Sequence, residues 1–474
     1  MYVYYNICIL NTLQKNALKS KAKPAPPPFS AAQLLRFFIQ LLPRRALYQL
    51  PALQTKDFYH RLFTPLVTLW YLLFQRLNPD HSLEAALSDA RAGGGDWLNK
   101  KLSPQLTSDS TASWSDARQR LPEEFLAQAL ALQGRQISGL SPTTLWQSWR
   151  LALLDGSTVR LRPHGRMAKH FPPARNQHRR SYWCLMRVVV CFCALSGAAL
   201  DCALGSSQLS EQVLACQLIL ACRPKSLFIG DRNFGVFRVV QAARQAGQAV
   251  LFRMTECRAR KLLGRALVAG EHAVRWEPTR HDQLQPACSK QPLEGRLLVV
   301  RLQRKGFRSL QLCLFTTMPA DYPLQELVRL YGLRWHIELN LRYLKAQMDL
   351  VQLEAKSPDM ARKEWLAGLL AYNLIRAAQL CAALQKGISP LTLSFSSVRR
   401  RLECWLRQLA GTKRQICAQW AKTLQQMGRC QLARRTKQRP NEPRAQRHLR
   451  LAYLPLYGSR ANARSHLKKY APKS

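Results

Sequence analysis

The sequence predicts an α/β protein whose core is interrupted by a β-rich insertion, with an all-helical domain before the core and a helical, basic region after it. Two observations carry this prediction. Between residues 141 and 254, short apolar runs typical of strands alternate with helical stretches, a pattern that indicates an α/β sheet. Outside the core, apolar residues recur at helical spacing. The length allows two to four domains and a sizeable buried core.

The chain before the core divides into a tail and a helical domain. Residues 1–29 end in the proline-rich KAKPAPPP, which predicts a disordered tail. Residues 30–140 contain segments such as LLRFFIQLL and EEFLAQALALQ, which predict an N-terminal helical DNA-binding domain. A plain helical bundle without DNA contact is the alternative interpretation.

The core itself is predicted in two parts. Residues 141–254 form the first part, with strands at 150–154, 188–195, 198–204, 226–230 and 249–254 and helices at 209–222 and 236–246. Residues 255–318 form the β-rich insertion, in which strands at 297–302 and 310–315 flank the turn-like RKGFR. The second part covers residues 319–384, and residues 385–474 are predicted to be a basic, helical and partly disordered C-terminal region.

The charge of the chain points to a polyanionic partner. The 72 Lys and Arg residues exceed the 27 Asp and Glu residues, which gives a net charge of +45. Nucleic acid is the first candidate, because each neutralised phosphate releases counterions. An anionic membrane is the second, but we find no run of about twenty apolar residues that would span one. The apolar opening MYVYYNICIL lacks the flanks of a secretion signal, so we expect a soluble, unsecreted protein.

The cysteines do not indicate a metal or disulfide framework. The chain has 14 of them, scattered through apolar segments and never in a C-x-x-C pair. Buried free thiols are therefore expected, rather than a zinc site or disulfides.

Two aspartates occupy matching positions in the predicted sheet. Asp155 and Asp231 each follow an apolar run and precede small or polar residues, so we expect each to lie where a strand stops. At the carboxyl ends of strands in an open α/β sheet, side chains project into the crevice that binds ligands. Each aspartate alone could instead be a turn former.

A third carboxylate lies in YGLRWHIELNLRYLK, residues 331–345. As one α-helix, this segment would place Tyr331, Arg334, Glu338, Arg342 and Lys345 within about 80° of arc. A second arc would hold an apolar stripe of Leu333, Ile337, Leu341, Leu344 and Met348. The alternative interpretation is a surface helix with ion pairs three or four residues apart.

Together the three carboxylates predict a metal site. Asp155, Asp231 and Glu338 would offer only oxygen ligands, which suit hard divalent cations such as Mg²⁺, or Mn²⁺ in its place. Two such ions about 4 Å apart can activate a water or a 3′-hydroxyl and stabilise the leaving oxygen of a phosphoryl transfer.

These motifs resemble those of a known family. The spacing Y-x2-R-x3-E-x6-K, read as Tyr331, Arg334, Glu338 and Lys345, resembles the YREK signature of DDE transposases of the fourth insertion-sequence family, which includes the Tn-five and Tn-ten enzymes. DGSTVRL and FIGDRNFG resemble the motifs around that family's two catalytic aspartates, and STASWSDARQRLP resembles its N-terminal helical domain. The resemblance covers roughly residues 35–380 and implies a ribonuclease H-like catalytic core.

The resemblance also implies an activity, partners and roles. It implies Mg²⁺-dependent DNA cleavage and strand transfer, with two ions per active site, on double-stranded DNA at transposon ends and target, by a homodimer in the cytoplasm at the bacterial nucleoid. Tyr331, Arg334 and Lys345 would hold the DNA backbone, with Arg342 on the same arc. Trp276 would be the insertion's base-stacking residue, although a packed core tryptophan is the alternative. A catalytically inactive DNA-binding descendant and a ribonuclease H-like nuclease without strand transfer are alternative functions.

Overall fold

The computed structural model describes residues 41–54, 61–78, 80–140, 145–175, 180–222, 225–285, 288, 290–302, 310–407 and 413–432. All of them belong to one compact unit. The tail predicted at residues 1–29 lies outside the described residues, as do residues 433–474 of the predicted C-terminal region.

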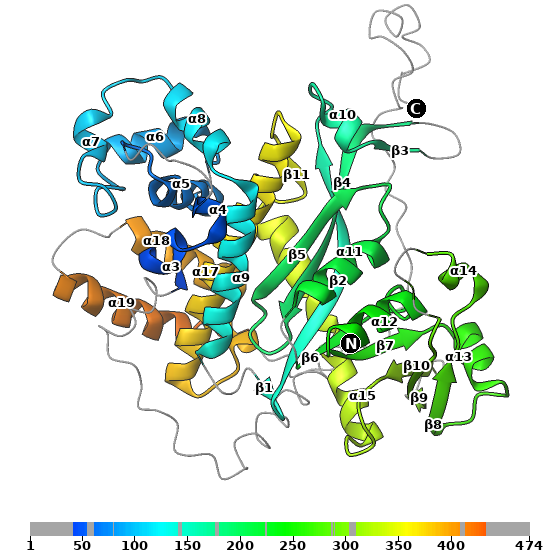
Figure 1. Ribbon diagram of the computed structural model, residues 1–474. Helices are drawn as coiled ribbons and strands as arrows, with labels where there is room; N and C mark the ends of the chain where they lie inside the picture. Colours follow the sequence, from blue (N-terminus) through cyan, green and yellow to red (C-terminus); the bar gives the residue numbers. More distant parts are fainter. Residues whose placement is uncertain are drawn as a thin grey trace, which may run out of the picture. The chain divides into compact units, whose positions relative to one another are not determined.

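Five strands form the centre of a large sheet, in the order β5-β4-β2-β6-β7. They are β2 (Trp149–Leu161), β4 (Arg180–Cys193), β5 (Ala199–Ser206), β6 (Ser226–Gly230) and β7 (Ala249–Met254). β4 pairs antiparallel with β2 and β5, whereas β6 pairs parallel with β2 and β7. Short strands β1 (Leu145–Trp146), β3 (Pro173–Arg175) and β11 (Gln352–Leu353) pair with β2 or β4. The predicted mixed α/β class is therefore present (Figure 1).

The β-rich segment extends this sheet. Its strands β8 (Gly270–Trp276), β9 (Leu293–Leu302) and β10 (Leu310–Thr316) pair antiparallel in succession. β10 then pairs antiparallel with β7, with Cys313 opposite Met254. Helices α13 (Glu256–Leu263) and α14 (Arg280–Gln283) lie between the strands in sequence. The predicted hairpin strands are confirmed, and they continue the central sheet.

Both faces of the central strands are buried. Leu151 and Leu153 of β2 belong to one apolar cluster, and Ala152 and Leu154 belong to a second cluster on the opposite face. Helices α11 (Glu211–Ala221) and α12 (Phe237–Gln245) contribute to the second cluster. Because strands buried on both faces are apolar at nearly every position, β6 appears in the sequence as the continuous run SLFIG.

The region before the sheet is helical. Its helices are α3 (Arg44–Tyr48), α4 (Pro51–Gln54), α5 (Pro65–Leu77), α6 (Leu83–Arg91), α7 (Leu102–Gln105), α8 (Ala112–Arg120) and α9 (Glu123–Gly139). The last of them packs against the sheet, since a Cβ built at Gly134 of α9 would lie 3.0 Å from the Cα of Leu200 in β5. α9 therefore helps to cover the first face of the sheet.

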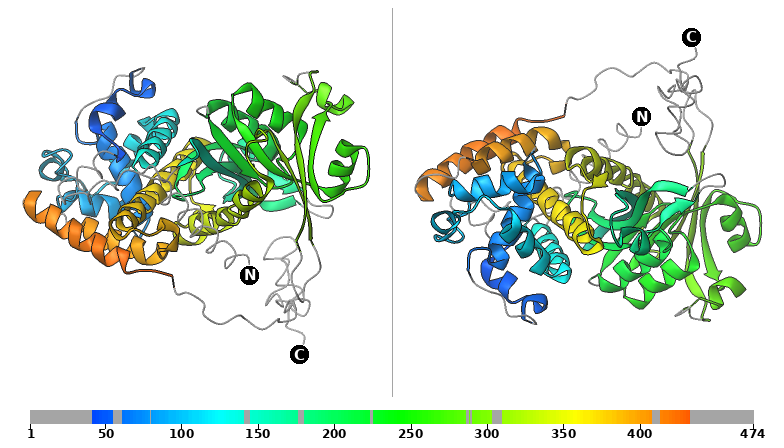
Figure 2. Two further views of the ribbon diagram at one scale, coloured as in Figure 1. Left: turned by 90° about the horizontal axis from the view of Figure 1, so that it is seen from below. Right: turned by 90° about the horizontal axis from the view of Figure 1, so that it is seen from above.

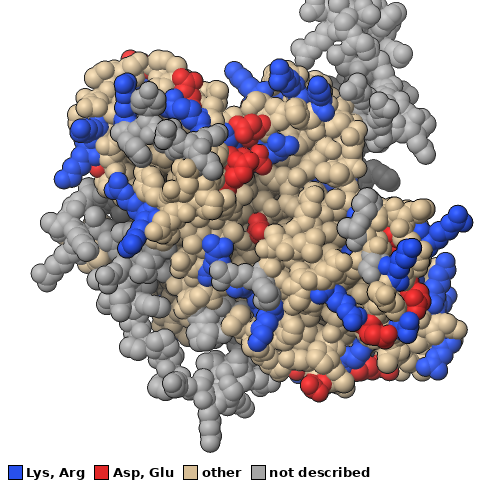
Figure 3. Space-filling view, in the orientation of Figure 1, with Lys and Arg blue, Asp and Glu red and all other residues tan. Residues whose placement is uncertain are grey.

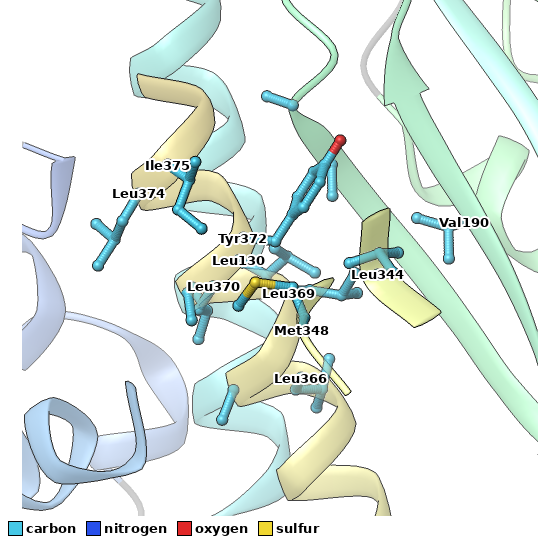
Figure 4. Packing of buried hydrophobic residues seen from close by; sticks show 14 of the residues in the cluster. Leu130, Val190, Leu344, Met348, Leu366, Leu369, Leu370, Tyr372, Leu374 and Ile375 are labelled. Carbon is cyan, nitrogen blue, oxygen red and sulfur yellow. The ribbon is translucent and has the colours of Figure 1, made fainter. Parts of the chain in front are cut away.

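The central helix α17 (Pro358–Lys386) joins these helices to the sheet (Figure 2). Glu364 of α17 bonds Arg76 of α5 and Arg118 of α8, each at 2.8 Å. The Asn373 amide bonds the backbone N–H and C=O of Ala199 in β5, at 2.8 and 2.7 Å. The apolar side chains of α17 pack with residues from β4 and from the segment around Met348 (Figure 4). The turn η3 (Pro390–Thr392), α18 (Phe395–Arg407) and α19 (Lys413–Gly428) follow and pack on α17.

From the sequence we expect no apolar run long enough to span a membrane, and by length and composition alone α17 contradicts this expectation. By length and composition α17 would be able to cross a membrane, but its most apolar stretch is fully buried inside the protein. The burial explains its composition, because a core helix surrounded by other elements is apolar on all sides.

The described cysteines are free thiols, but burial is as expected only in part, because Cys257 and Cys404 are exposed.

Candidate active site

The sheet brings Asp155 and Asp231 together. In the parallel pair of β2 and β6, Leu153 lies opposite Ile229. Two residues further along, the same register places Asp155 beside Asp231, and the two carboxylates interact electrostatically. Gly230 lies opposite Phe252 of β7, so the next residues, Asp231 and Arg253, continue the row.

The strand carrying Asp155 does not stop there, contrary to the sequence prediction. β2 runs on to Leu161, because β4 remains its antiparallel partner from Ala152 to that residue. What ends near Asp155 is the pairing with β6, whose last paired residue is Ile229. Asp155 is therefore at the edge of the β2–β6 pair although it lies inside a strand. Asp231, in contrast, directly follows the end of β6, as predicted.

The environment of Asp155 disfavours its charge. Burial, together with the nearby carboxylates of Asp231 and Glu211, raises the pKa of Asp155 to about 6. The Gly156 N–H, which donates to Asp155 Oδ1 at 2.8 Å, and the Arg334 guanidinium lower this pKa. Negative charge is thus gathered at this point with only partial compensation.

The predicted helix at residues 331–345 is divided into three pieces. Tyr331 lies near the end of α15 (Leu324–Gly332), and Arg334 directly precedes α16 (Trp335–Arg342) without a side-chain capping bond. A π-helical turn, η2 (Tyr343–Gln347), follows and carries Lys345. Between α15 and α16 the backbone bonds connect residues three apart, as from Arg334 N to Tyr331 O. The expectation of one regular helix is therefore wrong, and both the tight turn and the wide turn change the rotation per residue.

The apolar stripe of this segment is confirmed. The side chains are at most 9% exposed and belong to the first core cluster: Leu333, Ile337, Leu341, Leu344 and Met348. This burial leaves Glu338 and Arg342 exposed on another side of α16.

Arg334 connects the motif to the aspartates. Its Nη2 donates to Glu338 Oε1 at 3.0 Å, and its guanidinium also interacts with Asp155 and Tyr331. Although burial lowers the pKa of Arg334, these neighbours hold it above its usual range. Burial raises the pKa of Tyr331 to about 12, while Arg334 and Arg253 oppose the shift. Four of the predicted residues therefore meet around one guanidinium.

Two predicted DNA contacts differ in exposure. Arg342 is exposed and Lys345 is half-buried. Neither belongs to an ion pair in the described part of the chain, so both cations can meet an external anion.

Trp276 does not fit a base-stacking role in this structure. It is 7% exposed and packs edge-on against Phe237 and Phe315 with ring centroids 5.9 and 5.0 Å away. The packed core tryptophan is therefore the correct interpretation, and a base would have to displace two aromatic partners.

Sequence reasoning missed three polar residues at this site. Arg253 lies beside Asp231, Glu211 beside Asp155, and Asn233 donates its side-chain N–H to Glu211 Oε2 at 2.7 Å. Ser210–Glu211 has the sequence of a capped helix start, and Ser210 does accept from Val213 N. That signal indicated the helix but not the direction of its first side chain.

The carboxylates fit a divalent cation only in part. Asp155 and Asp231 offer hard oxygen ligands on neighbouring strands, whereas Glu338 is paired with Arg334. No group of three or more Asp, Glu, His or Cys side chains among the described residues is arranged to hold a metal ion. Two of the three predicted ligands are thus together, and the third is held by Arg334.

Basic side chains are widespread on one face of the molecule (Figure 3). On the face seen in Figure 3, Lys and Arg side chains are spread widely, and acidic side chains form a few small groups. This distribution agrees with the net charge of +45 and favours a polyanion as partner.

The family model of the transposase DDE domain matches residues 146–374, which include Asp155, Asp231 and Glu338. The transposase InsG of insertion sequence IS4 from Escherichia coli K12 is 26% identical over 291 residues, which cover 59% of this chain and 64% of that protein. These two matches support an IS4-family DDE transposase.

Shorter matches agree with this assignment. The putative transposase InsL of IS186A from Escherichia coli K12 and the transposase of IS421 from Escherichia coli are each 41% identical over 63 residues, 13% of this chain and 17% of theirs. A cryo-EM structure of a piggyBac transposase synaptic complex with hairpin DNA covers 85% of this chain and 87% of its own, at 9% identity and a TM-score of 0.41; this likeness is too distant to add to the assignment.

Proposed function

We propose that this chain binds the terminal inverted repeats of an insertion sequence and catalyses metal-dependent DNA strand cleavage and strand transfer. The observation that carries the proposal is the pair Asp155 and Asp231 on neighbouring parallel strands, with Arg334 linking Asp155 to Glu338. The core would be ribonuclease H-like, which the order and directions of β5-β4-β2-β6-β7 support.

The proposed roles follow from the chemistry of the side chains. Asp155, Asp231 and Glu338 would hold two divalent cations, Mg²⁺ or Mn²⁺. When bound, such ions supply activation of a water or 3′-hydroxyl and stabilisation of the leaving oxygen. Tyr331, Arg334 and Lys345 would hold the DNA backbone near the scissile phosphate, with Arg342 as a weaker contact.

Arg334 would change partners when DNA binds. A backbone phosphate competes with Glu338 for the guanidinium, because both are anions that accept charge-assisted hydrogen bonds. Release from Arg334 would leave the Glu338 carboxylate, which is 41% exposed, able to turn toward the aspartates. DNA binding would in this way complete the set of carboxylates.

The partners are proposed from the same chemistry. They are double-stranded DNA at the transposon ends and at the target, and a second copy of the chain in the synapse that joins two ends. We place the reaction in the cytoplasm, at the nucleoid, where the DNA is.

Cleavage of end DNA tests the proposal. Inverted repeats in the DNA flanking the gene identify the substrate, and labelled end duplexes are incubated with Mg²⁺ or Mn²⁺. We expect Asp155→Ala, Asp231→Ala and Glu338→Ala each to abolish cleavage while retaining DNA binding in EDTA, because each removes a ligand and no backbone contact. Glu338→Gln should behave like Glu338→Ala, since the charge binds the cation. Cleavage at near the wild-type rate would remove that residue from the site.

A catalytically inactive DNA-binding descendant is the second candidate. The Arg334–Glu338 ion pair favours it, because Glu338 is not grouped with the aspartates among the described residues. This candidate predicts end binding without cleavage in any divalent cation, by the wild-type chain as well as by the variants.

A further inference from the structure

Glu211 connects the two aspartate-bearing segments. It is the first residue of α11, and its Oε2 accepts a hydrogen bond from Asn233 Nδ2 at 2.7 Å. The Asn233 backbone N–H in turn donates to Asp231 Oδ1 at 2.8 Å. Gln212, the next residue of α11, donates to the Asn233 carbonyl at 3.0 Å. The first turn of α11 therefore holds the turn that carries Asp231.

On its other side the Glu211 carboxylate lies against Gly156. A Cβ built at Gly156 would be 2.3 Å from Glu211 Cδ and 2.5 and 2.7 Å from its two oxygens. Real Cβ atoms essentially never approach another atom within 3.0 Å. The backbone of Gly156 is not in the left-handed region, so space, and not backbone conformation, requires glycine here. Gly156 also donates its N–H to Asp155.

We infer that Glu211 is a positioning residue for the proposed DNA cleavage. It spans the gap between Gly156 on β2 and Asn233 after β6, and so sets how Asp155 and Asp231 stand relative to one another. Its role is to accept the Asn233 hydrogen bond from a fixed position on Gly156, which a neutral amide oxygen also performs. The inference rests on the proposed function, since it concerns the same two aspartates.

A double-mutant cycle on the full-length chain tests this role. Glu211→Ala should lower the single-turnover cleavage rate by about 10- to 100-fold, the usual effect of losing a supporting hydrogen bond at a metal site. Glu211→Gln should restore the rate to within about threefold of wild type, because the acceptor is kept. Gly156→Ala should resemble Glu211→Ala, since the new methyl group displaces the carboxylate. The Glu211→Ala, Gly156→Ala double variant should lose little more than either single variant.

Controls separate positioning from folding. Glu256 is also the first residue of a capped helix, α13, and it forms an ion pair with exposed Arg260 at 3.5 Å. Glu256→Ala removes the same kind of helix-terminal charge and should leave cleavage unchanged. Thermal unfolding and end binding in EDTA should be unchanged in the Glu211 variants, whereas the Mg²⁺ concentration for half-maximal cleavage should rise in Glu211→Ala and not in Glu211→Gln.

Three results would overturn the inference. One is a Glu211→Gln variant as slow as Glu211→Ala, which would show that the charge acts directly. Another is a double variant whose loss of cleavage rate equals the product of the losses in the two single variants. The third is normal cleavage by Asn233→Ala, which removes the same hydrogen bond from its other end and serves if Glu211→Ala fails to fold. Asp155→Ala distinguishes failure of the proposed function from failure of the inference about Glu211. If Asp155→Ala cleaves normally, the proposed function fails. If Asp155→Ala is inactive while Glu211→Ala cleaves normally, only the inference fails.

Discussion

Arg334 is the residue on which the interpretation of the site depends most. Its guanidinium is 22% exposed, bonds Glu338 and interacts with Asp155 and Tyr331. An arginine in this position has donors left over for a phosphate, because the guanidinium offers five N–H groups in a fixed geometry. The Arg334 side chain can therefore bond Glu338 in the absence of DNA and a phosphate of the DNA backbone in its presence.

Neutralising the motif cations should weaken the binding of end DNA. We expect Arg334→Ala or Lys345→Ala to lose about 1–3 kcal/mol of binding free energy, measured by titration of labelled end duplexes at fixed salt. Arg342→Ala, which removes an exposed cation outside the signature, is the matched control and should lose less. If Arg334→Ala bound and cleaved normally, its side chain would be only a partner of Glu338.

Asp201 makes a separate prediction about pH. Burial raises the pKa of Asp201 on β5 to about 6, while the Cys202 N–H at 2.8 Å and Arg135 of α9 oppose the shift. The thiols of Cys191 and Cys202 also face it. The unfolded chain has a carboxyl pKa of about 3.9. The folded pKa is the higher one, so the stability associated with Asp201 is fully present below pH about 4 and is lost as the pH rises through about 6.

Asp201→Asn should therefore raise the free energy of unfolding at pH 8 by about 1–3 kcal/mol and leave it unchanged at pH 4. Urea unfolding at the two pH values measures the difference. Asp109→Asn, at a side chain that is 98% exposed, is the control and should be neutral at both. An equal gain at both pH values would show that ionisation of Asp201 is not the cause.

At the scale of elements, α17 is stabilised by polar groups that are buried but partnered. Glu364, Arg76 and Arg118 are only 11–12% exposed and form a charged cluster that ties α5 and α8 to α17. Lys363 donates to the backbone carbonyls of Arg118 and Gln119 at the end of α8. A positive side chain near the carboxyl end of a helix is favourable, so Lys363 stabilises the end of α8. Lys363 and Glu364 are neighbours on α17, and both therefore tie α8 to this helix.

Glu364→Gln should destabilise the protein by about 3–5 kcal/mol, because it leaves two buried guanidiniums without their counter-charge. Chemical denaturation followed by tryptophan fluorescence measures the loss. Glu256→Gln, in an exposed pair with Arg260, should change stability by less than about 0.5 kcal/mol. A loss below about 1 kcal/mol for Glu364→Gln would mean that solvent screens the cluster.

The sequence predicted those elements whose pattern is local. The strands at 226–230 and 249–254 have the predicted bounds, and the apolar stripe from Leu333 to Met348 is buried. These predictions succeed because the apolar pattern of a strand or a helix repeats every few residues along the chain. Asp231 follows its strand for the same reason.

Other features depend on partners distant in the sequence. β2 continues past Asp155 because β4 pairs with it, so the run DGS is not a turn. The π-helical turn after α16 accompanies the stacking of Tyr343 on Phe395, 4.6 Å away, with Arg376 5.3 Å above the Tyr343 ring. Glu211 could not be recognised because its neighbours Gly156 and Asn233 come from two other segments.

At the scale of the whole molecule, charge governs assembly. With a net charge of +45, two free protomers repel each other, and the repulsion reaches about 8 Å through physiological salt. The exposed large apolar side chains of the described residues lie on separate elements, as Trp97, Tyr182 and Leu284 illustrate. Scattered single residues of this kind do not form an association surface.

We therefore expect a monomer that dimerises when DNA ends neutralise it. Each bound phosphate removes part of the repulsion and releases counterions, and a synapse needs two protomers related by symmetry. Light scattering of the full-length chain at moderate salt should give the mass of one protomer without DNA and of two protomers with two ends when end duplexes are added. A duplex of unrelated sequence is the control and should give a smaller dimer fraction. A stable dimer in the absence of DNA would contradict this, and would mean that a protein interface, which we would seek in the C-terminal helices, drives assembly.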